Sequence, residues 1–221
     1  FIDSTETTPD PQIALITAEW GEGKTSLFEG YLRSSAPKKY ISLLVPGGTF
    51  LNYLVKISKY EILPKGEIPG YRFLSAIMAT LAESIRSGNI GRNEFFSGVS
   101  LPNISEYKDS LTYIKDFLKK LFAAIPRDAK IFLFIDEFEE LATVGSLEVI
   151  RLATSGLVDF LNGRVTEVSR NGKFCGRLHI IISITPPAYE RLLQNVELAQ
   201  VINRFTQRVS CLLYTSPSPR D

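Results

Sequence analysis

The sequence has few cysteines, no long uncharged apolar run and little net charge. It has two cysteines, Cys175 and Cys211, which give neither a disulfide framework nor the spacing of a metal site. No apolar stretch approaches the uncharged run of about 18 residues that is needed to span a bilayer. The net charge of +1 argues against a uniformly basic coat for nucleic acid, although a local basic patch is compatible with it. These absences favour a protein of a reducing, cytoplasmic setting without membrane contacts.

The length of 221 residues is enough for one substantial core, or for one domain with a sizeable insertion. With 44% hydrophobic and 22% charged residues, the composition is ordinary for a globular protein. The last residues, CLLYTSPSPRD at 211–221, resemble a translated sequencing adapter, and the alternative is a genuine tail rich in proline and serine. We expect 211–221 to be artefactual and 1–210 to form the core domain of a longer reading frame.

Short apolar runs separated by helical patterns predict an α/β fold. Strands are expected at 12–17, 40–45, 130–135 and 178–184, with a fifth beginning at 207. Helices are expected at 24–33, 71–86, 107–125, 147–161 and 189–205. The strand runs are continuously apolar rather than alternating, which is typical of parallel strands that are covered on both faces. The pattern predicts a three-layer αβα fold with a mainly parallel sheet.

Residues 18–25 read AEWGEGKT and match the phosphate-binding pattern G-x-x-x-x-G-K-[ST], except that Ala18 replaces the first glycine. Gly21 and Gly23 would let the backbone curl around phosphate oxygens, which N–H groups and a helix N-terminus attract. Lys24 would reach the β and γ phosphates, and the Thr25 hydroxyl would ligate Mg²⁺. A strand is expected before the motif and a helix after it, which favours a nucleotide site over a chance match. The predicted nucleotide-binding residues are Ala18, Glu19, Trp20, Gly21, Glu22, Gly23, Lys24, Thr25 and Ser26.

Two carboxylates, Asp136 and Glu137, directly follow the apolar run at 131–135. At the C-terminal edge of a parallel sheet they would emerge where nucleotides bind. Asp136 is predicted to hold Mg²⁺, and Glu137 is predicted to take a proton from the attacking water. The alternative is a solvated strand end, since Glu139 and Glu140 follow closely.

The order of these motifs from 12 to 209 resembles the core of AAA+ or AAA+-like P-loop ATPases. The motifs read AEWGEGKTSL, FLFIDEFEEL, IIISITPPAYERL and NRF. An ABC ATPase would carry an LSGGQ-like signature before the acidic strand, and this sequence has none. The combination is most similar to the P-loop ATPases of BREX-type phage-defence systems and related archaeal ATPases, while WGEGKTSL is also similar to KAP-type ATPases. The resemblance implies a helical lid beyond the end of this sequence.

The resemblance also implies roles for a polar strand end and an arginine. In AAA+ proteins the strand beside the acidic one ends in a polar residue that contacts the γ-phosphate or the catalytic water. Thr185 is the first candidate for this residue and Ser183 the second, and a threonine that merely caps the strand is the alternative. Arg204 matches the arginine finger that reaches into a neighbouring subunit, with Arg208 as a rival and a surface arginine as the alternative.

Two segments are longer than a minimal core of this kind requires. Residues 46–130 exceed one crossover helix and predict an inserted helical pair. Residues 164–177 predict a β-hairpin around Asn171-Gly172. The hairpin collects basic residues, among them Arg170 and Lys173, and would either contact DNA or a protein client or form a solvated loop.

Together these patterns predict an ATPase that uses ATP and Mg²⁺. We expect it to drive or switch a larger nucleic-acid- or protein-remodelling assembly, with phage defence as one setting, and to act as a homo-oligomer or in a larger complex. One alternative is a signalling or scaffold switch with little turnover. The other is a P-loop kinase that transfers phosphate to an acceptor other than water.

Overall fold

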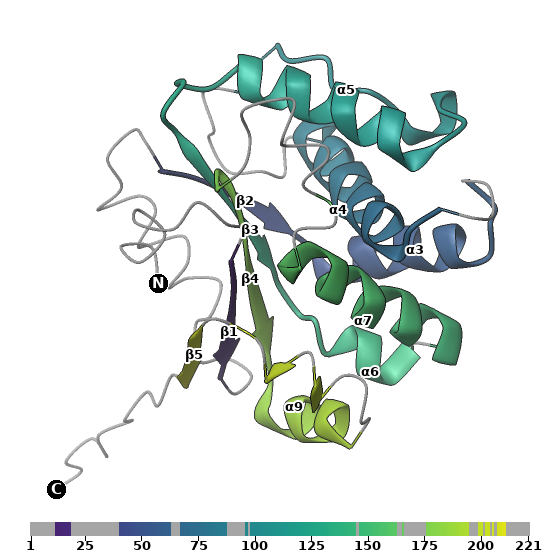
Figure 1. Cartoon of the computed structure of the whole chain (residues 1–221), viewed down its shortest axis with the longest axis vertical. Helices are drawn as coiled ribbons and strands as arrows, with labels where there is room; N and C mark the ends of the chain where they lie inside the picture. The colour runs from purple at the N-terminus through teal and green to yellow at the C-terminus, as the bar shows by residue number, and fades with distance from the viewer. Residues whose placement is uncertain are drawn as a thin grey trace, which may run out of the picture.

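The structure is a computed structural model that describes residues 12–18, 40–62, 67–87, 96, 98–144, 146–162, 165, 176–194, 199–200, 202–203, 205 and 207–210. Its centre is a five-stranded sheet (Figure 1). The strands are β1 (Ile13–Thr17), β2 (Tyr40–Val45), β3 (Lys130–Ile135), β4 (Leu178–Ile184) and β5 (Gln207–Ser210). They lie in the order β2-β3-β4-β1-β5, and every neighbouring pair is parallel. The predicted α/β fold with a parallel sheet is confirmed.

Strand β4 lies between β1 and β3. Its register places Thr17 of β1 opposite Ile184, and Ile135 of β3 opposite Ile182. In a parallel sheet all strands leave the same edge with their carboxyl ends, and ligands bind at that edge. The segments that follow β1 and β3 therefore emerge at the same edge of the sheet, with β4 between them.

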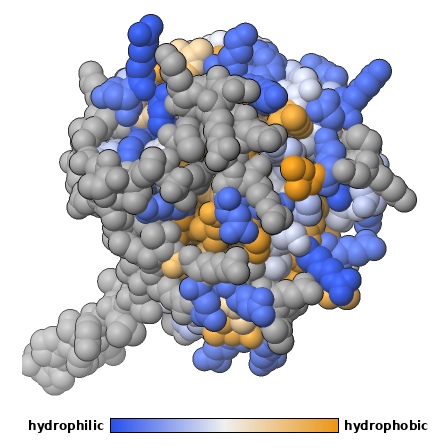
Figure 2. All heavy atoms as spheres, in the orientation of Figure 1, coloured by the Kyte–Doolittle hydropathy of each residue, from blue (hydrophilic) through white to orange (hydrophobic). Residues whose placement is uncertain are grey.

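Helices α3, α4, α5 and α7 lie on one side of the sheet (Figure 1). The helices are α3 (Gly47–Ser58), α4 (Pro69–Arg86), α5 (Ser110–Ala123), α6 (Glu140–Val144), α7 (Leu147–Leu161) and α9 (Pro186–Leu193), with a short 3-10 helix at Ile104–Glu106. In the part of the chain that the structure describes, no helix has the length and apolar character to cross a membrane. Figure 2 shows mostly hydrophilic side chains around the rim of the described surface, with hydrophobic ones in smaller groups.

Several helix bounds differ from the sequence prediction. The segment Pro46-Gly47-Gly48 ends β2 as expected, but α3 begins at once, because extended Pro46 serves as its N-cap and accepts a hydrogen bond from Phe50 N–H at 2.9 Å. Helix α9 begins at Pro186 rather than Tyr189, since prolines fit a first turn whose N–H groups have no helical partner. It ends at Leu193 rather than continuing to Phe205, although residues 199–200 and 202 are helical again. Helix α6 was not predicted.

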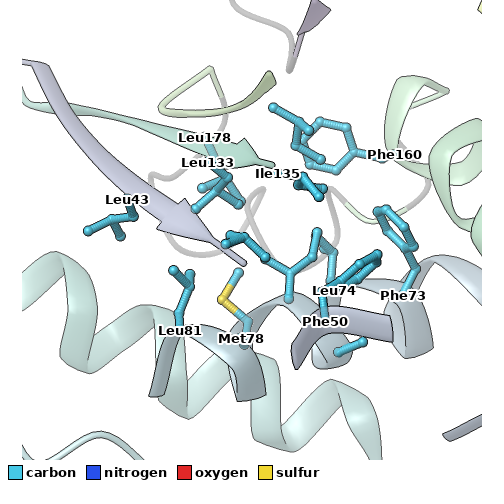
Figure 3. Close-up of a cluster of buried hydrophobic side chains, with 14 of the residues drawn as sticks. Leu43, Phe50, Phe73, Leu74, Met78, Leu81, Leu133, Ile135, Phe160 and Leu178 are labelled. Carbon is cyan, nitrogen blue, oxygen red and sulfur yellow. The ribbon is translucent and has the colours of Figure 1, made fainter. Parts of the chain in front are cut away.

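Both faces of the sheet are buried, as a three-layer arrangement requires. On one face, side chains of the strands pack against those of the helices (Figure 3). Figure 3 labels Leu43, Phe50, Phe73, Leu74, Met78, Leu81, Leu133, Ile135, Phe160 and Leu178 of this core. On the other face, Phe132 and Phe134 of β3 are fully buried with Ala14 and Ile181. Because alternate residues of a strand point to opposite faces, this two-sided burial explains the continuous apolar runs.

Helices α4 and α7 approach each other closely at two points. A Cβ atom added to Gly156 of α7 would lie 2.3 Å from Cβ of Phe73, which is fixed to the backbone of α4. One turn further on, the buried Asp159 carboxylate accepts a hydrogen bond from Gly70 N–H at 3.0 Å and so caps the N-terminus of α4. The two helices therefore leave no room for a larger side chain at Gly156.

We predict that Gly156→Ala lowers the thermal midpoint. The helix propensity of alanine would add up to about 1 kcal/mol if the position had room. Here the two helices must separate instead, and overpacking of this kind costs about 1–3 kcal/mol. Thermal unfolding followed by circular dichroism measures the change, with Ser155→Ala on the same helix as the control that should differ little from wild type. An unchanged or raised midpoint for Gly156→Ala would show that the helices have room to spare.

His179, the chain's single histidine, is fully buried in β4. Its ring stacks on Phe132 with the centroids 5.1 Å apart, and Nε2 donates to the Gly176 carbonyl at 3.0 Å. Burial, and to a smaller extent the positive charge of Lys130, lower the pKa of His179 to about 4, although the bond to Gly176 acts in the opposite direction. The folded protein therefore holds this ring neutral.

This pKa predicts a loss of stability in mild acid. Between about pH 6.5 and pH 4 the unfolded chain protonates its histidine and the folded chain does not, so the free energy of unfolding falls as the pH falls through that window. The slope should be roughly 1 kcal/mol per pH unit. Denaturant unfolding at pH 7.5 and pH 5 measures it, and His179→Phe should remove most of the difference. If both proteins lose the same stability between these pH values, the histidine is not its source.

Candidate functional site

The candidate site lies at the sheet edge where β1, β3 and β4 end. Each segment that leaves a strand here remains hydrogen-bonded to a neighbouring strand. Ala18 N–H donates to the Ile184 carbonyl at 3.2 Å, and Phe138 N–H donates to the Ser183 carbonyl at 3.1 Å. Asp136 N–H donates to the Val45 carbonyl of β2 at 3.1 Å. The end of β4 therefore connects the first residue of the phosphate-loop motif to the acidic segment.

Asp136 has a carboxylate whose position is fixed by hydrogen bonds. The Ser183 hydroxyl donates to Oδ1 of Asp136 at 2.5 Å, and Glu137 N–H donates to the same oxygen at 3.0 Å. Ser183 is fully buried, whereas Asp136 is half-buried. Two hydrogen bonds to one oxygen of a carboxylate limit its rotation. The two hydrogen bonds therefore hold the Asp136 carboxylate in one orientation at the sheet edge.

Glu137 has an unusual backbone conformation. Its φ is 54°, in the left-handed region that residues other than glycine seldom occupy, at a cost of about 1–2 kcal/mol. This conformation aims its N–H at Asp136 and also at the Ser183 hydroxyl, 3.3 Å away. Backbone strain of this kind is found preferentially at functional sites. The side chain of Glu137 is half-buried at this edge of the sheet.

The start of α3 packs against the backbone of the acidic pair. A Cβ added to Gly47 would lie 2.4 Å from the Asp136 carbonyl oxygen and 2.7 Å from that of Glu137. Only glycine fits there, because the contacted atoms are backbone and cannot rotate away. At the next residue, Gly48, an added Cβ would meet only the flexible carboxylate of Glu140, at 3.1 Å. The sequence analysis did not predict the contact of Gly47 with the acidic pair.

The structure distinguishes the two candidates for the polar strand end. Ser183, the second candidate, binds Asp136 directly. Thr185, the first candidate, is buried and serves as the N-cap residue of α9, although its hydroxyl does not cap the helix. By register it lies level with Ala18, one residue beyond the Thr17–Ile184 pair. Ser183 thus faces the acidic pair, and Thr185 lies beside the start of the phosphate-loop motif.

Several predicted site residues lie outside the described part of the chain. These are Glu19 to Ser26, including Lys24 and Thr25, together with Arg170, Lys173 and Arg204. Arg208 belongs to β5, but its side chain is not described. The roles of all these residues stay predictions.

The donor chemistry at this edge fits Mg²⁺. Among the described residues there is no group of three or more metal-ligating side chains. Magnesium does not need one, because it is usually held by one or two carboxylates together with substrate phosphates and water. The fixed Asp136 carboxylate is a hard oxygen donor of the kind that Mg²⁺ prefers.

Comparison with known proteins gives little beyond the fold. No family model matches the chain, and no curated protein matches it. The solved structure of the Aeropyrum pernix ORC2 protein in ADPNP–ADP complexes is similar to it, with 15% sequence identity and a TM-score of 0.47. The match covers 95% of this chain and 43% of that one, so the chain spans less than half of that protein's length. The fold class of this chain follows from its own parallel strand order.

The contact at Gly47 predicts a position-specific effect. Gly47→Ala should destabilise the protein by about 1–3 kcal/mol, because α3 or the acidic pair must move to admit a methyl group. Gly48→Ala is the matched control, since it changes the same residue type in the same helical turn but meets only a flexible side chain. Denaturant unfolding of the two variants measures the difference. Equal stability of the two variants would show that the acidic pair is not held by α3.

Proposed function

We propose that this chain binds ATP with Mg²⁺ and hydrolyses the nucleotide, as the core of an AAA+-like ATPase. One observation supports this most: the Asp136 carboxylate, fixed by Ser183, lies at the same sheet edge as Ala18, where the phosphate-loop motif begins. A motif match alone is weak, but a matching loop and an oriented carboxylate on one edge are what a Mg²⁺–nucleotide site requires.

In this proposal the phosphate-loop motif binds the phosphates, and the acidic pair contributes to the Mg²⁺ site. Backbone N–H groups of residues 19–25 would surround the phosphates, and Lys24 would place its ammonium beside the β and γ phosphates. Thr25 and Asp136 would hold Mg²⁺, which when bound would neutralise charge that develops on the phosphate oxygens. Ser183 positions Asp136 by fixing one of its oxygens. Thr185 remains a candidate for contact with the γ-phosphate or the attacking water.

Glu137 is the proposed general base. Its carboxylate would take a proton from water as the water oxygen bonds to the γ-phosphorus and the bond to the β–γ bridging oxygen breaks, which gives ADP and phosphate. The half-buried position of Glu137 at the sheet edge, directly after Asp136, supports this role. Asp136 would then hold the metal ion, and Glu137 would accept the proton from water.

The wider role is proposed from sequence motifs. We propose that the ATPase drives or switches a nucleic-acid- or protein-remodelling assembly, and phage defence is the setting that the motif combination favours. Arg204 would complete the site of a neighbouring subunit in an oligomer. Arg170 and Lys173 would contact a DNA or protein client. A slow ATP-dependent switch and a P-loop kinase are the competing functions, separated by the turnover rate and by the acceptor of the phosphate.

Two substitutions test the proposed chemistry. Lys24→Ala should abolish or nearly abolish binding of ATP–Mg²⁺, because the cation that faces the phosphates is lost. Glu137→Gln should retain binding but lower hydrolysis by roughly 10²–10⁴-fold, because the amide cannot accept a proton. Calorimetric titration measures binding, and phosphate release measures turnover.

Glu140→Gln is the matched control, since it neutralises another half-buried carboxylate of the same segment and should leave hydrolysis unchanged. Wild-type affinity in Lys24→Ala would rule out the phosphate loop. Wild-type hydrolysis in Glu137→Gln would rule out the general base. Transfer of the phosphate to an acceptor other than water would favour the kinase.

A further inference from the structure

A second site lies in the helical layer, away from the sheet edge described above. A cavity of about 270 Å³ opens between the end of α3, the start of α4 and the first half of α7. In Figure 1 these helix ends lie on the side of the molecule opposite β1 and β5. Two arginines line the cavity, Arg72 from α4 and Arg151 from α7, together with Tyr60 and Glu148.

Arg72 is a buried cation. It is 8% exposed, donates one hydrogen bond from Nη2 to the Ile57 carbonyl, and lies under the Tyr60 ring with Cζ 4.4 Å from the centroid. Its Nε is buried without a hydrogen-bond partner. No carboxylate in the described ranges forms an ion pair with it; the ion pair found there joins Lys120 to Asp116. A buried guanidinium without a counter-charge is costly, and an anion in the cavity would remove that cost.

The rest of the cavity adds positive charge. Arg151 is exposed at its wall, and Glu148, one turn earlier on α7, is the carboxylate among the lining residues. Two guanidinium groups against one carboxylate leave the cavity with an excess of one positive charge. Arginine presents a planar set of N–H donors that matches a carboxylate with two parallel hydrogen bonds. The two arginines therefore favour an anion that can accept two parallel hydrogen bonds, as a carboxylate can.

Exposed apolar side chains flank this basic cavity. In the described part of the chain the exposed large hydrophobic residues are Tyr60 (41%), Ile68 (41%) and Leu147 (56%). Tyr60 lines the cavity, Ile68 directly precedes the lining residue Pro69, and Leu147 directly precedes Glu148. All three therefore lie at or next to the wall. A charged pocket that contains arginine and tyrosine, with apolar neighbours, has the composition of a protein-interface hot spot.

We propose that this cavity is a docking site for a partner polypeptide, which inserts an aspartate or glutamate side chain between Arg72 and Arg151. Apolar residues beside that acid would pack on Tyr60, Ile68 and Leu147. A free inorganic anion would leave these side chains exposed. The proposal does not depend on the ATPase chemistry.

Peptide selection tests the docking site. A display library of random 12-residue peptides is selected on the wild-type chain, and the selected peptides are then measured against variants by fluorescence anisotropy. We expect peptides with one acidic residue among apolar ones. Replacing that acid by its amide, or Arg151 by glutamine in the protein, should weaken binding at least tenfold. Leu147→Ala should weaken binding to a lesser extent.

The test leaves Arg72 unchanged, because replacing this buried side chain would destabilise the fold. Arg151 and Leu147 are exposed, so their variants should keep the wild-type thermal midpoint. Arg127→Gln, at an exposed arginine outside the cavity, should leave the affinity unchanged. Selected peptides without an acid, or peptides insensitive to Arg151→Gln, would overturn the proposal. So would acetate or inorganic phosphate that displaced the peptides at micromolar concentration, since the cavity would then be a small-anion site.

Discussion

The hydrogen bonds that the end of β4 makes on both sides hold the candidate site in register. Toward β1, the Ile184 carbonyl accepts from Ala18 N–H, and toward β3, Ser183 binds Asp136 through its hydroxyl and Phe138 through its carbonyl. A central parallel strand can serve two neighbours in this way because its own carboxyl end leaves the sheet at the same edge as theirs. The relative position of the phosphate-loop motif and the acidic pair is therefore set by one strand.

The acidic pair is held between β4 and the start of α3. The cost of the left-handed backbone at Glu137 is offset by its N–H, which reaches both Asp136 and Ser183. On the other side, Gly47 leaves just enough room for the carbonyl groups of the pair. Neither of these two contacts involves a charged side chain of another element.

The strands were predictable from the sequence, and the details of the site were less so. Buried parallel strands have continuous apolar runs, so β2, β3 and β4 were placed at their observed ends. The start of α3 was missed because proline and glycine favour turns locally, whereas here Pro46 caps a helix and Gly47 is required by a tertiary contact. The contact of Ser183 with Asp136 depends on the register of two strands that are distant in the sequence, which a single sequence does not reveal.

The short connection from β4 to α9 has a mechanical consequence. Thr185 alone separates the last residue of β4 from Pro186, and two successive prolines restrict the backbone at the start of the helix. Helix α9 also contacts α6, which follows the acidic pair. A shift of the β4 end by a fraction of an ångström would be carried into α9 as a tilt, because no flexible loop lies between them to absorb it. Helix α9 is thus the element that would report a change of state at the sheet edge to the outer surface of the protein.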